Sequence, residues 1–466
     1  MTFCYSAMNG LSINSFGRVR RCCVVSTMRT TMGTPGVTEV NDLDFINTYP
    51  YKVAEDGKIG YQPHGNFGWY PKIQEAKHVY DLVNDVLLCD LRKDLLNGDR
   101  PSVCQRCFPI EDQGGVSFRM NYNKDHAEYA VYDSVEPDGT IKNHDAITYL
   151  DITLGNTCNL QCKTCNPWSS HNWLKEVKVL PHQDYDDNGS VEKGTANPWY
   201  VKAFAHRDEW GNGFFDPILP NVRTINFLGG EPLVVKEHDD WLQYIIDKDW
   251  ASNKKLQYTT NGTTIPNKLI DTWKNFERIN LGISIDAIGD LAGYVRYPSK
   301  WNVIAKNFDK LRHRCKVDAK NIYVQMHTTI SSLNVQNIEE IYDFSAEQYS
   351  LWHYWDDDKK RQHGYINMLP HINMVDFPTF YHVRQLPDEM KDNACKVIDR
   401  TYNKYKDRVE NEWELSNLEN LINLKKSVMQ ERDPAIWQQF IDVQIASDKF
   451  RGVSITDHLP WMNNYV

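Results

Sequence analysis

The side chains best suited to chemistry in this sequence are three closely spaced cysteines, Cys158, Cys162 and Cys165. Their C-x3-C-x2-C spacing follows a strand-like run, Ile147 to Leu154, so all three thiols are expected on one loop. Three thiolates on one loop can bind three irons of a 4Fe-4S cluster, which normally takes four cysteine ligands. The remaining iron would then be open to a small molecule, and chemistry could take place there.

Two other interpretations of the triplet stay open. A zinc site could combine these cysteines with a distant Cys or His, although tetrahedral zinc usually shows paired C-x2-C units. The three residues could also be unrelated buried thiols, which their close spacing argues against. The spacing therefore favours an iron–sulfur cluster.

The cysteine loop resembles that of the radical S-adenosylmethionine (SAM) enzymes, in which a C-x3-C-x2-C loop follows the first strand of a partial (β/α) barrel. The residue before the third cysteine is often aromatic in that family and is Thr164 here, a difference that concerns a contact to adenine. The resemblance implies that Cys158, Cys162 and Cys165 hold a 4Fe-4S cluster to which SAM binds.

A second motif of the family follows the triplet in the expected order. The strand-like run Thr224 to Leu228 leads into Gly229-Gly230-Glu231-Pro232, which resembles the family's GGE motif. Glycine lets a backbone approach a ligand closely, and a carboxylate can accept a hydrogen bond from the ammonium group of SAM. On its own this tetrapeptide would indicate an ordinary turn.

Polar residues also follow two later strand-like runs. The resemblance implies that Ser284 and Asp286 hydrogen-bond the ribose of SAM and that Arg296 meets its carboxylate. Without the resemblance, Asn261-Gly262 would indicate a hairpin turn, Asp286 a helix N-cap and Arg296 a solvated side chain. The full set of expected SAM contacts is Gly229, Gly230, Glu231, Asn261, Ser284, Asp286 and Arg296.

Six strand-like runs, each separated by enough residues for a crossover helix, predict an α/β fold. With the resemblance, they predict a partial (β/α)6 TIM-type barrel with a small amino-terminal cysteine-rich domain and a helical carboxyl-terminal extension. Loops at the carboxyl ends of barrel strands converge on one face, so distant motifs can surround one ligand. The expected strands are residues 147–154, 224–228, 256–260, 279–285, 322–331 and 365–369.

The pattern divides the chain of 466 residues into three expected regions. Residues 1–125 form the auxiliary cysteine domain, residues 145–370 the barrel, and residues 371–466 a largely helical extension. A long insertion, residues 166–222, exceeds a usual βα connection. It is equally consistent with a lid or substrate-recognition element and with a tolerated surface insertion.

A second group of cysteines lies in the amino-terminal region. Cys4, Gly17 and Cys22 resemble the C-x9-15-G-x4-C half of a SPASM or twitch domain, which normally follows the barrel in radical SAM enzymes. Cys104 and Cys107 form a later C-x2-C pair. The resemblance implies that these four cysteines hold a second, auxiliary 4Fe-4S cluster, and a four-thiolate zinc site is the alternative.

An amphipathic helix is predicted between the two halves of this group. Apolar residues from Ile73 to Leu95 recur at intervals of three and four, and Gly98 and Pro101 would end the helix. Such a helix would bring the C-x2-C pair back towards the start of the chain.

The composition of the chain indicates its cellular compartment and the classes of partner that it is unsuited to bind. The net charge of −10 disfavours a surface built for nucleic acid, and no apolar run is long enough to span a membrane. No cysteine is assigned to a disulfide, which suits a reducing compartment, so we expect a cytoplasmic protein.

The resemblance implies an enzyme that cleaves SAM reductively at a 4Fe-4S cluster to generate a 5′-deoxyadenosyl radical for C–H activation. It also implies a peptide or protein substrate and an external one-electron donor such as flavodoxin or ferredoxin. The alternative is a non-catalytic iron–sulfur or zinc module on a barrel scaffold, with a binding or redox role. That module would bind metal without cleaving SAM.

Overall fold

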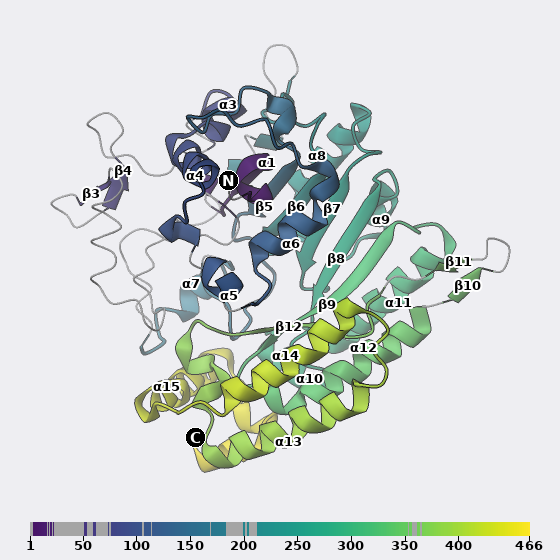
Figure 1. The fold of residues 1–466 in the computed structure, drawn as a ribbon. Coiled ribbons are helices and arrows are strands. Elements are labelled where there is room, and N and C mark those ends of the chain that lie inside the picture. The colour runs from purple at the N-terminus through teal and green to yellow at the C-terminus, as the bar shows by residue number, and fades with distance from the viewer. Residues whose placement is uncertain are drawn as a thin grey trace. The chain divides into compact units, whose positions relative to one another are not determined.

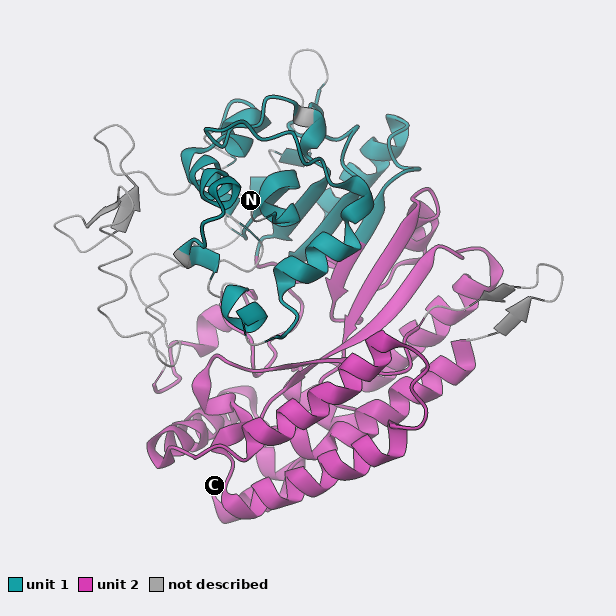
Figure 2. Ribbon diagram, viewed as in Figure 1, with its two compact units in different colours: residues 1–155, 194–229, 235–256 teal, residues 156–193, 230–234, 257–466 magenta. Residues whose placement is uncertain are grey.

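The computed structural model describes residues 3–15, 17, 19–20, 22, 51–53, 59–61, 73, 76–104, 107–112, 114–167, 169–182, 199–200, 203–204, 212–352, 354–356, 361–363 and 366–466. The chain forms two compact units (Figure 2), which are considered separately below. Unit 1 comprises residues 1–155, 194–229 and 235–256, and unit 2 comprises residues 156–193, 230–234 and 257–466. Part of the predicted insertion, residues 166–222, lies outside the described residues.

The main sheet strands of unit 1 lie in the order β6-β5-β1-β2. The parallel pairs are β1 with β5 and β5 with β6, whereas β2 runs antiparallel to β1. Alternate residues of β5 are apolar and fully buried on one side of the sheet, as in a strand that packs against helices. The strands are β1 (Gly10–Ile13), β2 (Val19–Arg20), β5 (Tyr149–Leu154) and β6 (Thr224–Gly229).

Helices complete unit 1. They are α1 (Tyr5–Asn9), α3 (Val79–Val83), α4 (Val86–Asn97), α5 (Phe108–Asp112), α6 (Phe118–Asp125) and α8 (Lys236–Asp247). A separate antiparallel pair consists of β3 (Tyr51–Val53) and β4 (Ile59–Tyr61).

The amphipathic segment predicted as one helix forms two helices, α3 and α4. The side chain of Asp85 accepts a hydrogen bond from the backbone N–H of Leu87 at 3.0 Å and thereby starts α4 as an N-cap. Gly98 ends α4 as predicted, because its φ of 88° is a left-handed conformation that glycine adopts without strain. Periodicity alone did not reveal the break, since apolar spacing continues across it.

Unit 2 contains strands in the order β12-β9-β8-β7, and β8, β9 and β12 are parallel. Alternate residues of β9 are buried throughout its length, and the residues between them are half-buried. The strands are β7 (Lys255–Thr260), whose last four residues belong to this unit, β8 (Arg278–Ser284), β9 (Ile322–Ile330) and β12 (His371–Met374).

Helices α10, α12, α13, α14 and α15 of unit 2 contribute to one apolar core. The predicted helical segment near the carboxyl end contains the neighbouring helices α13 and α14, which lie side by side (Figure 1). The helices are α7 (Trp173–Glu176), α9 (Asn267–Trp273), α10 (Gly289–Val295), α11 (Trp301–Val317), α12 (Ile338–Trp352), α13 (Asp388–Tyr405), α14 (Glu412–Val428) and α15 (Pro434–Arg451). A short antiparallel pair consists of β10 (Tyr354–Asp356) and β11 (Arg361–His363).

The predicted α/β fold is confirmed. Strands β5 to β9 and β12 follow one another in chain order with helices between them, and the strand pairs within each unit are mostly parallel. The predicted division into domains stays a prediction.

The sixth strand was predicted too early in the chain. Residues 365–369 were expected to form it, but the strand is β12, and Ile366 makes only an isolated parallel bridge with Val324. Pro370 lies between the predicted and the observed strand, and proline cannot donate to a strand ladder. The buried apolar side chains before it, including Leu369, belong to the core without belonging to the strand.

None of the helices in the described ranges is both long enough and apolar enough to cross a membrane.

Candidate functional site

The cysteine triplet lies on the loop that opens unit 2. All three residues are free thiols; Cys158 is buried, and Cys162 and Cys165 are half-buried. Burial raises the pKa of Cys158 to about 11 and that of Cys165 to about 12, and the neighbouring thiols of the triplet act in the same direction. The three thiols therefore lie within electrostatic reach of one another.

Hydrogen bonds from the following segment fix the loop. The indole Nε1 of Trp173 donates to the carbonyl oxygen of Cys162 at 3.2 Å, and Nδ2 of Asn172 donates to that of Cys158 at 2.8 Å. The backbone N–H of Leu160 donates to Sγ of Cys158 at 3.4 Å. A thiolate that accepts such a bond is stabilised, which is the state a metal ligand needs.

Glu231 of the GGE motif is buried and holds two neighbouring segments together. Its Oε1 accepts hydrogen bonds from Oγ1 of Thr260 at 2.7 Å and from the N–H of Leu233 at 3.2 Å, and its Oε2 accepts from the N–H of Asn261 at 2.6 Å. Burial raises the pKa of Glu231, which these donors oppose. Three donors already occupy most of the roughly four acceptor positions of a carboxylate. The side chain is thus largely engaged within the protein, which the motif did not indicate.

Asn261 contacts the cysteine loop directly. Its Nδ2 donates to Oδ1 of Asn159 at 2.8 Å and lies 4.0 Å from Sγ of Cys158. Its Oδ1 accepts hydrogen bonds from the N–H and Oγ1 of Thr263 at 2.9 and 2.6 Å. The end of β7 is therefore joined to the triplet, as the sequence predicted for residues after barrel strands.

Asp286 and Arg296 form a buried ion pair beside the triplet. Nη1 of Arg296 donates to Oδ2 of Asp286 at 2.6 Å, and Oδ1 accepts from the N–H of Thr329 at 2.8 Å. Burial lowers the pKa of Arg296, but Cys162 and Asp286 outweigh it, so the pKa is raised and the guanidinium stays charged. Nε of Arg296 is buried without a hydrogen-bond partner among the described residues, so the site has a donor to offer.

Two predicted residues lie at the margins of this arrangement. Ser284 ends β8 two residues before Asp286, and its contact with ribose stays a prediction. Gly229 is the last residue of β6 and belongs to unit 1, whereas Gly230 belongs to unit 2.

Gly230 packs against the backbone that leads into the triplet. A Cβ at this position would lie 2.2 Å from the carbonyl oxygen of Thr157, the residue before Cys158. We expect Gly230→Ala to displace this backbone, to destabilise the protein by about 1–3 kcal/mol and to lower the iron bound at the triplet. Thermal unfolding and iron analysis of the purified variant measure both effects.

Gly114→Ala is the control for this substitution. Gly114 has a φ of +77°, and nothing lies within 4 Å of an added Cβ. This variant should be strained in its own backbone and keep the iron content of the wild type. Equal iron loss in both variants would contradict the role given to Gly230.

All four amino-terminal cysteines belong to unit 1, and Cys4 lies near both Cys104 and Cys107. Cys4 and Cys104 pack against the same apolar cluster, which includes Leu95 of α4 and Phe108. Burial raises the pKa of Cys4 to about 11, and Cys107 adds to the rise, so these two thiols lie within electrostatic reach. Cys22 follows β2 in the same unit. A cluster on Cys4, Cys22, Cys104 and Cys107 stays a prediction.

Among the described residues, no three His, Cys, Asp or Glu side chains are arranged as ligands of one metal ion. A cluster distributes its cysteine ligands over several irons, one to each.

Sequence motifs did not reveal a charged network behind the triplet. Lys163, which stands between the second and third cysteines, donates from Nζ to Oδ1 of Asp448 at 2.7 Å. Glu176 accepts from Nε of Arg451 at 2.8 and 3.0 Å. The lysine inside the cysteine motif could indicate a buried ion pair, but its partner Asp448 lies far away in the sequence.

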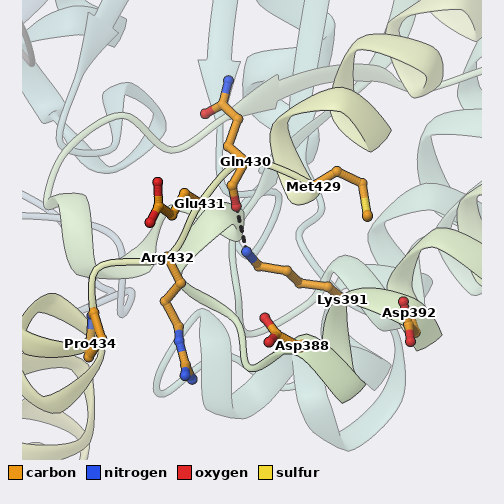
Figure 3. Close-up of a pocket in the computed structure, with 8 residues that line it drawn as sticks. All are labelled: Asp388, Lys391, Asp392, Met429, Gln430, Glu431, Arg432 and Pro434. Atoms are coloured by element: carbon orange, nitrogen blue, oxygen red, sulfur yellow. Dashed lines mark hydrogen bonds between the residues drawn. The ribbon is translucent and has the colours of Figure 1, made fainter.

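A surface pocket of about 340 Å³ lies elsewhere in unit 2 (Figure 3). It is formed by the start of α13 and the connection between α14 and α15, and Nζ of Lys391 donates to the carbonyl oxygen of Gln430 at 2.5 Å beside it. None of the predicted site residues lines it; its lining is Asp388, Lys391, Asp392, Met429, Gln430, Glu431, Arg432 and Pro434.

No family model matches the chain, and no curated protein matches it. Among solved structures, it is similar to SuiB of Streptococcus suis bound to S-adenosylmethionine, with a TM-score of 0.25 and 15% identity over 42% of this chain and 36% of SuiB. It is also similar to anSMEcpe with bound AdoMet and a peptide, with a TM-score of 0.33 and 12% identity over 58% of this chain and 61% of that protein. SuiB bound to the precursor peptide SuiA gives a TM-score of 0.30 and 11% identity over 83% of this chain and 84% of SuiB. The chain thus spans less than two thirds of the first two of these structures.

Proposed function

We propose that this chain is a radical SAM enzyme. The observation that carries the proposal is the convergence of separate motifs on the cysteine triplet within unit 2. Glu231 and Arg296 act electrostatically on Cys158, and Asn261 lies 4.0 Å from its sulfur. Arg296 also lies within electrostatic reach of Cys162 and Cys165. Motifs that the resemblance assigned to one cofactor and one cosubstrate therefore surround the same three thiols.

The residues present fit a 4Fe-4S cluster with an open iron. Cys158, Cys162 and Cys165 would hold it, since they are free, converging thiols on one loop. When bound, the reduced cluster and SAM supply a 5′-deoxyadenosyl radical for hydrogen abstraction from an unactivated C–H bond.

The surrounding side chains would bind SAM. The charged guanidinium of Arg296, with its free Nε, suits the carboxylate of the methionine moiety. Asp286 and Ser284 would hydrogen-bond the ribose, and Gly229 and Gly230 would let the backbone approach the ligand. Glu231 and Asn261 would fix the strand ends against the cysteine loop through the bonds given above. Because these groups are largely buried, they would also keep water from the reacting atoms.

The remaining assignments extend this proposal. The cysteines at positions 4, 22, 104 and 107 would hold an auxiliary 4Fe-4S cluster, with zinc as the alternative metal. A peptide or protein is the proposed substrate, and flavodoxin or ferredoxin the proposed class of electron donor. The absence of assigned disulfides supports a cytoplasmic location.

Formation of 5′-deoxyadenosine tests the function. The anaerobically reconstituted, dithionite-reduced chain is given SAM, and the product is measured by chromatography. We expect product from the wild type and none from the variant lacking the three cysteines. A wild-type sample with an intact cluster that neither cleaves nor binds SAM would favour a non-catalytic module.

A further inference from the structure

A buried arginine from the last long helix lies behind the cysteine loop. Arg451 ends α15, its side chain is fully buried, and its Nε donates to both carboxylate oxygens of Glu176. Its Nη1 and Nη2 have no hydrogen-bond partner among the described residues. Leaving such donors unsatisfied in the interior is costly, so an acceptor is expected beside them.

Two aromatic residues connect this guanidinium to the backbone of the cysteine loop. Cζ of Arg451 lies 5.2 Å from the ring centroid of Trp173 and 4.9 Å from that of Tyr297. Trp173 donates from its indole Nε1 to the carbonyl oxygen of Cys162, and the carbonyl oxygen of Tyr297 accepts from the N–H of Gln161 at 2.6 Å. Both residues beside the guanidinium are therefore bonded to the backbone at Cys162 or the residue before it.

Hydrogen bonds on both sides of Cys162 hold α15 in this position. The side chain of Gln161 donates to Glu176, which also accepts from Oγ of Ser447 at 2.5 Å. On the other side, Nζ of Lys163 donates to Oγ of Ser447 at 2.8 Å and to Asp448. The network joins α15 to the residues that flank the second cysteine, so Arg451 has little freedom to turn away.

The charges that act on the Cys162 thiol are consistent with a position of Arg451 near the cysteine loop. Burial raises the pKa of the Cys162 thiol, and the positive charges of Arg296 and Arg451 oppose that rise. The ion pairs Lys163–Asp448 and Arg451–Glu176 are each neutral overall, so the network adds directed N–H donors rather than net charge.

We propose that, when a cluster is bound at the triplet, Arg451 donates hydrogen bonds from its Nη atoms to a cluster sulfide beside Cys162 and raises the reduction potential of the cluster. This inference rests on the proposed function, because it requires a cluster at the triplet. Hydrogen bonds to cluster sulfurs are among the factors that set reduction potentials, since donors stabilise the more negative, reduced state. Helix α15 would thus raise the reduction potential of the cluster in addition to forming part of the apolar core.

The test is a redox titration of the reconstituted full chain, followed by electron paramagnetic resonance. The signal absent from the triple cysteine variant identifies the cluster at the triplet. Because Arg451→Met alone would leave Glu176 buried and unpaired, the comparison is between Arg451→Met/Glu176→Gln and the matched control Glu176→Gln. We expect a more negative midpoint potential in the double variant than in the control.

A second variant, Arg451→Lys, keeps the charge but replaces the planar fork of five N–H donors by a single ammonium nitrogen, which cannot reproduce the separate directions of Nε and Nη. Its midpoint should shift in the same direction by a smaller amount. Equal midpoints in all variants, with the cluster retained, would overturn the inference and leave the proposed function intact. Loss of the cluster from the double variant, with an unchanged midpoint in Arg451→Lys, would also overturn it in favour of a structural role. A wild-type triplet that binds no iron would overturn both proposals.

Discussion

Replacement of Cys158, Cys162 and Cys165 together by alanine should remove one 4Fe-4S cluster, about four irons per chain, and leave any metal at the amino-terminal cysteines. The physical reason is that the two groups of thiols belong to separate compact units, so neither depends on the other for its ligands. Iron and sulfide analysis of the reconstituted variant measures the loss. Metal analysis of what remains would distinguish a second iron–sulfur cluster from zinc.

The control for this variant is Cys315→Ala. Cys315 is a buried cysteine of α11 in the same unit, and burial raises its pKa to about 12. A buried neutral thiol outside the triplet behaves as a small apolar side chain, so iron content should not change. Loss of all iron from the triple variant would contradict two independent sites. Full retention of iron would remove the triplet as a ligand set.

The parallel strands were the most predictable part of the fold. Each of the five correctly placed runs is short, apolar and bounded by polar or turn residues, and β5 to β9 begin and end within two residues of expectation. The sixth strand was misplaced because residues 366–369, which were predicted to belong to it, are mostly apolar but lie in a loop. Apolar residues such as Leu369 fill the core from a loop, and periodicity cannot distinguish a buried loop from a buried strand.

The site was predictable where the chemistry resides in local motifs. Asn261 lies beside Cys158 and Arg296 pairs with Asp286, because strand ends carry these residues, and their roles in binding SAM stay predictions. The engagement of Glu231 by three internal donors depends on the precise positions of other strand ends, which no motif encodes. Arg451 was not predictable at all, since its partner Glu176 is 275 residues away.

Removing the charge of Arg296 from its ion pair with Asp286 is the second change for which we expect a large effect, a loss of stability. Asp286 is 1% exposed, so Arg296→Met would leave a buried carboxylate without its cation. Breaking a buried ion pair in this way typically costs about 3–5 kcal/mol, because the remaining charge is uncompensated. Only the bond from the backbone N–H of Thr329 to Oδ1 would remain from the contacts described above. We expect a large fall in the urea midpoint of the apo protein.

A double-mutant cycle separates this electrostatic loss from lost packing. Asp286→Asn/Arg296→Met removes both charges, so it should be less destabilised than the sum of the two single variants. Additive losses would contradict a direct pair. Midpoints are the quantity to compare, because a chain with two compact units need not unfold in one step.

The same double variant distinguishes the structural role of Arg296 from its proposed role in binding SAM. Restoring charge balance repairs the fold, but it does not restore a guanidinium that can bond the methionine carboxylate. The double variant should therefore be more stable than Arg296→Met and keep its iron. Its affinity for SAM, measured by equilibrium dialysis on the reconstituted protein, should fall at least tenfold, about 1.4 kcal/mol, below that of the single variant Asp286→Asn, which lacks the same ribose contact. Unchanged affinity in a folded, iron-loaded double variant would show that Arg296 serves only to neutralise Asp286, and another cation would have to bind the carboxylate.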